Sequence, residues 1–278
     1  MIGMALPSYA TLPQRAWHYG LRVFSGLVFL FLVAPILVVL PLSFNAEPYF
    51  SYPMPGYSLR WYNILFNDPV WTLAARNSVI VAVATTALSM LLGTLAALGL
   101  SRPGFPLRQV VMGVVLSPLI VPIVITSIGI YFFYAKLNLA NSLAGLILAH
   151  TVLAVPFVVI MVTATLSGFD VNQARAGASL GANPLQVFFR ITMPLIMPGI
   201  FSGAVLAFVT SFDEVVVVLF LAGLEQRTIP REMFKNVREQ TEPTIIAVSC
   251  LLVAMSVVFL VLMEWLRRRN LQLRGLSS

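Results

Sequence analysis

Six long apolar runs dominate this chain, and they restrict it to a membrane fold. They cover about residues 21–44, 78–100, 109–134, 142–166, 195–221 and 245–266. An apolar run of about 18 residues or more is typical of a membrane-spanning helix. Only 10% of the residues are charged, whereas soluble domains carry roughly 25%. We therefore predict an all-α membrane protein with six transmembrane helices.

Six spans place both termini on the same side of the membrane, and the basic residues indicate which side. If the N-terminus is cytoplasmic, ten of the 17 Lys and Arg residues lie in cytoplasmic segments. Arg102 and Arg108 occupy a very short loop, and Arg267, Arg268 and Arg269 follow the last run. Basic residues in such positions set the orientation. We predict cytoplasmic segments at residues 1–20 and 269–278 around a transmembrane domain at residues 21–268.

Several other classes of protein and site find no support in the sequence. The net charge of +7 is explained by orientation and anionic lipid headgroups rather than by nucleic acid. The first run is too long for a signal peptide and has no cleavage site after it, so we expect an anchor. His18 and His150 have no second metal-type ligand at helical spacing, and Cys250 has no partner cysteine. We expect packing or interfacial roles for all three, with no metal and no bound cofactor.

Residues 170–194, DVNQARAGASLGANPLQVFFRITMP, interrupt the apolar runs on the cytoplasmic side. Asp170 or Asn172 is a suitable helix N-cap, and Gly181 is a suitable helix stop. Asn183-Pro184 forces a turn and then starts a second helix. The two helices are too short to span a membrane, so we predict a helix-turn-helix elbow suited to docking in a groove of a partner protein.

The elbow resembles the coupling loop of the membrane permease subunits of binding-protein-dependent ABC importers. The signature of that family is Glu-Ala-Ala, a short spacer and Gly, followed by a hydrophobic-Pro step. Residues 175–194 match it with Gly181 on the signature glycine, but Arg175 stands where the family usually has Glu, and Gly177 where it has the second Ala. The resemblance implies docking into a cleft of the ATPase subunit through Arg175, Ala176, Gly177, Leu180, Gly181, Ala182, Asn183, Pro184 and Phe188.

Other stretches resemble the polyamine-type permeases, specifically the second of their two permease subunits. They are PLSFN at residues 41–45, YSLRWYNILFND at 57–68, LSPLIVPIVITSIGI at 116–130, LSGFD at 166–170 and LAFVTSFDEVVVVLFLAG at 206–223. The resemblance implies a type I importer permease fold and half of a translocation pathway for spermidine- or putrescine-like cargo in the bacterial cytoplasmic membrane. 4-Aminobutyrate, an opine or another small amino compound is the alternative cargo.

The same resemblance implies the partners. They are a homologous second permease subunit, two copies of a cytoplasmic ABC ATPase that bind ATP and Mg, and a periplasmic or extracellular substrate-binding protein received by the outer segment at residues 223–243. The chain has no phosphate-cradling motif, so we expect it not to be an enzyme by itself. A secondary transporter, the rival class, usually has more spans and an internal repeat. A membrane-embedded enzyme would need clustered catalytic groups.

Asp213 and Glu214 lie within the fifth run and are the main candidates for the substrate pathway. A charged side chain at the bilayer centre costs at least about 2.5–3.5 kcal/mol unless it faces water or a counter-charge. Two interpretations are open for each carboxylate. It attracts a cationic cargo, or it accepts hydrogen bonds from a neighbouring helix in a packing or gating role. The second interpretation is favoured for Glu214, and both stay open for Asp213.

The third run supplies further pathway candidates. Pro118 and Pro122 interrupt the helical hydrogen bonds near Thr126 and Ser127, which indicates either a pathway lining or a packing kink. Tyr131 and Tyr134 fit interfacial aromatics or, alternatively, an aromatic surface for ammonium groups.

Overall fold

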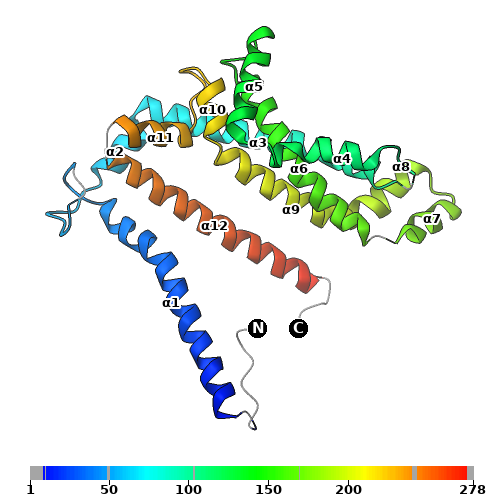
Figure 1. The fold of residues 1–278 in the computed structure, drawn as a ribbon, viewed down its shortest axis with the longest axis horizontal. Helices are drawn as coiled ribbons and strands as arrows, with labels where there is room; N and C mark the ends of the chain where they lie inside the picture. The colour runs from blue at the N-terminus through cyan, green and yellow to red at the C-terminus, as the bar shows by residue number, and fades with distance from the viewer. Residues whose placement is uncertain are drawn as a thin grey trace. The chain divides into compact units, whose positions relative to one another are not determined.

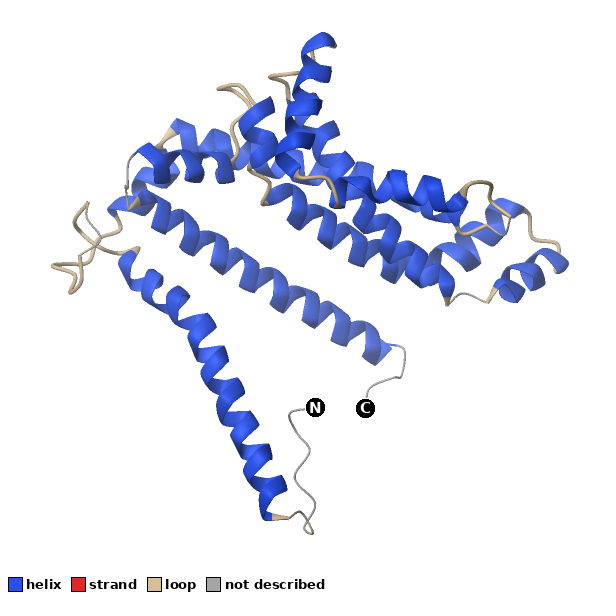
Figure 2. Ribbon diagram, in the orientation of Figure 1, coloured by secondary structure: helices blue, strands red, loops and turns tan. Residues whose placement is uncertain are grey.

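The computed structural model of the chain describes residues 9, 11–48, 51–102, 104–168, 170–239 and 243–273. Regular structure in these residues is helical, which confirms the predicted all-α class (Figure 2). The one strand-like pairing found there is an isolated bridge between Asn45 and Tyr57. The chain divides into two compact units, residues 1–67 with 240–278 and residues 68–239. A single transmembrane domain over residues 21–268 stays a prediction.

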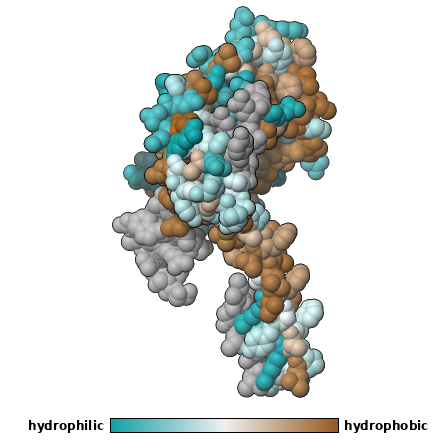
Figure 3. Space-filling model, turned by 90° about the vertical axis from the view of Figure 1, so that its left-hand side faces the viewer, coloured by the Kyte–Doolittle hydropathy of each residue, from teal (hydrophilic) through white to brown (hydrophobic). Residues whose placement is uncertain are grey.

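The first unit contains α1 (Leu12–Leu42), α2 (Arg60–Asn67) and α12 (Thr244–Leu273). α1 begins earlier than the apolar run because Thr11 caps it, with the Thr11 N–H donating to Gln14 Oε1 at 3.0 Å. In Figure 3, α1 is hydrophobic over much of its length and carries hydrophilic side chains at its lower, N-terminal end. That pattern fits a membrane helix with one end at the polar surface.

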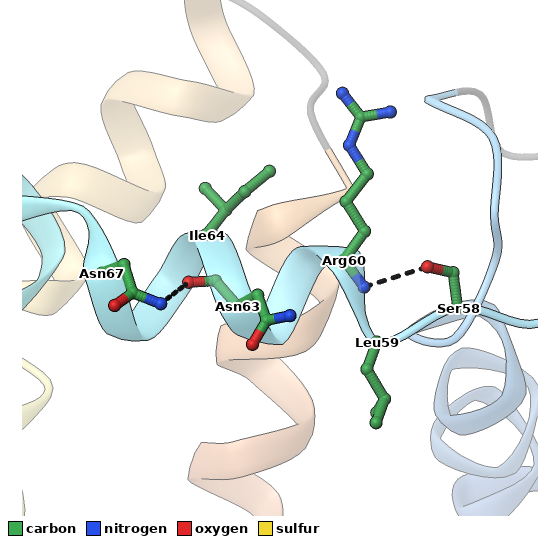
Figure 4. A pocket seen from close by; sticks show the side chains of 6 residues that line it. All are labelled: Ser58, Leu59, Arg60, Asn63, Ile64 and Asn67. Atoms are coloured by element: carbon green, nitrogen blue, oxygen red, sulfur yellow. Dashed lines mark hydrogen bonds between the residues drawn. The ribbon is translucent and has the colours of Figure 1, made fainter.

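The loop after α1 is fastened to α2. The Trp61 indole N–H donates to the Asn45 carbonyl at 2.7 Å, and the Tyr62 hydroxyl donates to Ser43 Oγ at 2.9 Å. Trp61 is 3% exposed, so its hydrogen bond is shielded from water. An open pocket beside these contacts is lined by Ser58, Leu59, Arg60, Asn63, Ile64 and Asn67 and contains none of the predicted site residues (Figure 4).

The second unit is built on three long helices that pack side by side: α3 (Pro69–Leu100), α6 (Leu143–Ser167) and α9 (Met193–Phe212) (Figure 1). Small residues let them approach closely, as in other membrane helix bundles. A Cβ added at Gly93 of α3 would lie 2.7 Å from Val158 Cβ, and one at Gly203 of α9 would lie 2.8 Å from Val158 Cα. Val158 of α6 is therefore held between two glycines.

The shorter elements of this unit join and cap the three helices. They are α4 (Arg108–Leu116), a 3-10 turn (Ser117–Leu119), α5 (Ile123–Lys136), α7 (Val171–Ser179), α8 (Pro184–Val187), a π-helical turn (Phe188–Thr192), α10 (Val216–Leu221) and α11 (Ile229–Glu239).

Length and composition qualify four helical segments as membrane spans: Leu12–Leu42, Pro69–Leu100, Leu143–Ser167 and Pro184–Phe212. The third predicted span is not one straight helix, because Arg108–Leu119 and Ile123–Lys136 meet at 100°. Proline explains the break, since Pro122 cannot donate the next helical hydrogen bond. Counted as one span, the bent pair makes five, and the Thr244–Val258 stretch of α12 is a shorter apolar helix. Six spans and cytoplasmic termini thus stay a prediction.

The fifth predicted span, residues 195–221, is wrong as a continuous helix. α9 ends at Phe212 and α10 begins at Val216, so residues 213–215 form a break that we call the corner. The carboxylate of Glu214 accepts a hydrogen bond from the Val217 N–H at 2.9 Å and so helps to start α10. Asp213 and Glu214 consequently lie at a helix end and not within a helix.

Candidate functional site

The elbow covers residues 170–194, and its first arm is α7. Local hydrogen bonds define both ends of α7. Asp170 Oδ1 accepts from the Asn172 N–H at 2.9 Å, which identifies Asp170 as the N-cap. At the other end the Gly181 N–H donates to the Ala178 carbonyl at 3.0 Å, and the Ala182 N–H donates to the Gly177 carbonyl at 3.2 Å. This pair of bonds is a Schellman motif. Gly181 has φ +89°, a conformation that favours glycine, and the predicted helix stop is confirmed.

The second arm starts with a reciprocal cap and continues into α9. Asn183 Oδ1 accepts from the Gln186 N–H at 2.8 Å, and Gln186 Oε1 accepts from the Asn183 N–H at 2.9 Å. After α8 the helix widens into the π-helical turn, in which the Met193 N–H bonds to the Phe188 carbonyl. Pro194 has no N–H to offer the carbonyl four residues before it, which favours the wider turn. The elbow is therefore joined to α9 by unbroken helical structure.

The two arms touch at Gly177. A Cβ placed there would overlap Ile191 Cδ1, the end of a flexible side chain in the π-helical turn, so an alanine would require Ile191 to shift. Gly177, the departure from Ala, therefore lies at a contact between the two arms that the sequence did not reveal.

The outer surface of the elbow combines large apolar side chains with polar and basic ones. Leu180 is 88% exposed, Leu185 is 68% exposed and Phe189 is 62% exposed. Arg175 and Ala176 are also exposed, as are Gly181, Asn183, Pro184 and Arg190, whereas Ala182 and Phe188 are half-buried. Such a surface, with two exposed arginines and three large exposed apolar side chains, fits a groove on a partner protein.

The predicted pathway residues divide between α5 and the corner. α5 packs against α10, which follows the corner, so the two groups lie in one region of the unit. Asp213 is exposed and is the C-cap residue of α9, with its N–H donating to the Val209 carbonyl at 3.0 Å. Glu214 is half-buried and accepts the hydrogen bond that starts α10. That contact is local, three residues along the chain, and not with a neighbouring helix, so the role of Glu214 stays a prediction.

The α5 candidates differ in how far they reach a surface. The Ser127 hydroxyl is buried and donates to the Ile123 carbonyl at 2.7 Å within its own helix. Thr126 is half-buried and bonds in the same way to the Pro122 carbonyl at 3.4 Å. Tyr131 is 39% exposed, but Tyr134 is 7% exposed and belongs to the apolar core with α10. Of the two tyrosines, Tyr131 is therefore the one whose side chain reaches the surface.

Sequence reasoning missed a polar contact between two core helices. His150 of α6 and Ser211 of α9 are 1% and 5% exposed, and His150 Nδ1 lies 2.9 Å from Ser211 Oγ. The residues are 61 positions apart, and no local pattern signals the pair. His150 has a packing position, as predicted, but it also links helices.

The outer segment, residues 223–243, is attached to α3 by hydrogen bonds. Asn77 of α3 donates to the carbonyls of Glu225 and Arg227, at 2.8 and 3.0 Å, and the Ile229 N–H donates to Ser78 Oγ at 2.8 Å. Glu232, in α11, is only 4% exposed.

Charges on this segment pair with one another. Arg227 Nε lies 3.8 Å from Glu232 Oε1, and Arg231 donates to the Gly223 carbonyl. Burial lowers the pKa of the Arg231 guanidinium from its ordinary value, and the neighbouring Glu232 opposes that change. Residues 240–242, near the far end of the predicted segment, lie outside the described residues.

No metal centre is found in the part of the chain that the structure describes. No group of three or more His, Cys, Asp and Glu side chains there could hold a metal ion.

Comparison with known proteins identifies the family. The model described as "Binding-protein-dependent transport system inner membrane component" matches residues 89–272. The spermidine/putrescine transport permease PotC of Haemophilus influenzae is 29% identical over 90% of this chain and 96% of its own length. The putrescine transport permease PotI of Escherichia coli is 33% identical, covering 81% of this chain and 82% of its own. The molybdenum transport permease ModB of Mycobacterium bovis is 33% identical, covering 69% of this chain and 78% of its own length.

Solved structures show the same fold. A bacterial ABC transporter involved in the import of the acidic polysaccharide alginate has a chain that superimposes with a TM-score of 0.78 at 15% identity, covering 93% of this chain and 99% of that chain. A chain of an amino acid ABC transporter gives a TM-score of 0.58 at 15% identity, covering 75% of this chain and 98% of that chain. The matched region contains α6, the elbow and the corner, and the chain therefore belongs to the family of inner membrane components of binding-protein-dependent transport systems.

Proposed function

We propose that the chain is a permease subunit of an ABC importer and forms half of the pathway for a cationic, polyamine-type cargo such as spermidine or putrescine. Its family membership supports the transporter class, and the names of PotC and PotI support the cargo. The observation that carries the cargo proposal is the exposed Asp213 carboxylate at the C-terminal end of α9. A helix C-terminus has partial negative charge and favours cations. Helix dipole and carboxylate therefore attract an ammonium group together.

The location of the corner gives Asp213 an early role in transport. In the proposed topology both termini are cytoplasmic, six segments span the membrane and the elbow lies on the cytoplasmic side. α9 has 20 residues, and at about 1.5 Å per residue it is about 30 Å long, the thickness of the hydrocarbon core. Asp213 then lies near the outer face, where cargo arrives from a binding protein on the outer segment.

The elbow provides the coupling to ATP hydrolysis in this proposal. Two ATPase subunits bind ATP and Mg, and each receives one elbow, this chain's or that of the second permease subunit. Leu180, Leu185 and Phe189 supply exposed apolar contact area. Arg175 carries the opposite charge to the family's usual glutamate, so we expect an acidic residue facing it. Movement of the elbow reaches α9 directly because helical structure joins them.

ModB, with a different cargo in its name, is as similar in sequence as PotI, so identity alone does not select a cargo. A small amino compound such as 4-aminobutyrate is the second candidate, because its ammonium group satisfies the same carboxylate. The test must therefore compare cargos of different charge.

The decisive experiment measures ATP-driven uptake into proteoliposomes that contain the complete complex and its binding protein. Labelled spermidine, putrescine, 4-aminobutyrate and molybdate are offered to wild type, Asp213→Asn and Glu47→Gln. Glu47 is an exposed carboxylate of the loop after α1, outside the outer segment, and serves as the matched control. A hydrogen bond to a charged group contributes about 1.5–3 kcal/mol, so loss of the Asp213 charge should slow polyamine uptake about tenfold or more.

The control variant should transport polyamines at the wild-type rate. Uptake of 4-aminobutyrate alone would select the second cargo, and uptake of molybdate alone would exclude both. Normal polyamine uptake by Asp213→Asn would show that this carboxylate has no part in the pathway.

A further inference from the structure

The contact between His150 and Ser211 is a polar link inside apolar packing. Leu146, Ala149 and Leu153, on the same helix as His150, are all buried in the core. Separating two buried hydrogen-bonding groups leaves both without a partner, which is unfavourable in a medium that offers no water. The link therefore fixes the C-terminal end of α9 against the N-terminal third of α6.

The imidazole depends on Ser211. Its other nitrogen, Nε2, is buried and has no hydrogen-bond partner among the described residues. Within that part of the chain, the Ser211 contact is the polar contact that holds the ring. Removing the Ser211 hydroxyl leaves His150 free to change its rotamer.

The corner begins two residues after Ser211, and α6 holds the chain on both of its sides. Before the corner, His150 holds Ser211. After the corner, Val217, Val218 and Leu221 of α10 pack into the apolar core cluster that includes Leu146, Ala149 and Leu153 of α6. The corner is therefore a short segment between two contacts with α6, the His150–Ser211 contact before it and the apolar packing of α10 after it.

We propose that His150, acting through Ser211, is a positioning residue that fixes the corner on α6 and so sets where the Asp213 carboxylate meets the cargo. The geometric part, a corner fixed by His150, stands on the contacts alone. The part that concerns cargo rests on the proposed function.

The geometric part is tested by pulsed EPR on the full transporter complex. Spin labels are attached at Ile160 of α6 and at Val209 of α9, two residues before Ser211, which are 41% and 55% exposed, in a Cys250→Ser background. Ser211→Ala should broaden the distance distribution at least twofold. His150→Asn, which keeps a polar group near the position of Nδ1, should retain the wild-type width.

Thr151→Val is the matched control for this measurement. Thr151 is also buried on α6, but its hydroxyl donates to the Ile147 carbonyl of its own helix at 2.7 Å. Its loss should leave the distribution narrow. An unchanged width in Ser211→Ala would overturn the proposal, and so would equal broadening in Thr151→Val, because general loosening would then explain the effect.

The cargo part is tested by a double-mutant cycle in spermidine uptake. Ser211→Ala should slow uptake about fivefold in the wild type but less than twofold in the Asp213→Asn background, because the charge that it positions is already gone. Independent, multiplied effects would refute the link to Asp213. If Asp213→Asn transports normally while Ser211→Ala broadens the distribution, the proposed cargo role fails and the fixed corner stands.

Discussion

Replacing Gly203 by Ala should separate the central helices of the second unit. The added Cβ would lie 2.8 Å from Val158 Cα and 3.3 Å from Val158 Cβ. Carbon atoms prefer separations of about 3.5–4.0 Å, so α6 and α9 must move apart by about 1 Å at this contact. The nearest atom belongs to the backbone, so no side-chain rotation relieves the contact. Overpacking of this kind costs about 1–3 kcal/mol, and we expect the upper half of that range.

The assay is reversible chemical unfolding of the purified protein in detergent, with Gly99→Ala as the matched control. Gly99 lies in α3 and has no atom within 4 Å of an added Cβ. Its replacement should stabilise the helix by up to about 1 kcal/mol, since alanine has the higher helix propensity. Equal stability of Gly203→Ala and Gly99→Ala would refute the close packing of α6 and α9.

A second replacement distinguishes side-chain from backbone contact. A Cβ at Gly93 meets Val158 Cβ at 2.7 Å and Val158 Cγ1 at 2.8 Å, so its conflict is mainly with the side chain. Val158→Gly should therefore couple strongly with Gly93→Ala, with an interaction energy above about 1 kcal/mol, and more weakly with Gly203→Ala. Equal coupling would contradict the difference between the two contacts, a side-chain contact at Gly93 and a backbone contact at Gly203.

Three further predictions concern local contacts. Gly181→Ala should destabilise the elbow by about 1–2 kcal/mol, because φ is +89° there. It should also lower the ratio of cargo transported to ATP hydrolysed. A normal ratio would show that the elbow does not couple transport to ATP hydrolysis. Asn183→Ala should cost about 1 kcal/mol through loss of the α8 cap and speed amide exchange at residues 184–192, and unchanged exchange would contradict the capping role. Asn77→Ala should remove two hydrogen bonds, each of about 1 kcal/mol, and speed tryptic cleavage after Arg227, whereas wild-type cleavage would mean that Asn77 does not hold the outer segment.

The elbow could be predicted because its signals are local. Asp170 caps α7, Gly181 ends it and Asn183-Pro184 starts the next helix, as hydrogen bonds between residues at most five positions apart confirm. The apolar runs likewise predicted the long helices α1, α3 and α6, because the bilayer sets the length of a span. These features follow from neighbouring residues and the solvent, so one sequence suffices to find them.

The sequence predicted the position of the bend in the third span but not its angle. Pro118 and Pro122 indicated an interruption, but the angle of 100° depends on which surfaces α4 and α5 cover. Gly177 departs from the family signature, and the signature does not indicate its contact with Ile191. That contact depends on how the two arms of the elbow pack.

The corner was decided by tertiary structure. Residues 195–221 are apolar on both sides of Asp213 and Glu214, and hydropathy describes a continuous span there. The helix breaks because two separate attachments to α6, the His150–Ser211 contact and the apolar packing of α10, fix the segments before and after it. The sequence by itself determined the membrane class, the long helices and the elbow, all of which depend on short-range order. Where the carboxylates lie also depends on contacts between residues 60 or more positions apart, and such contacts across helices leave no periodic pattern in the chain.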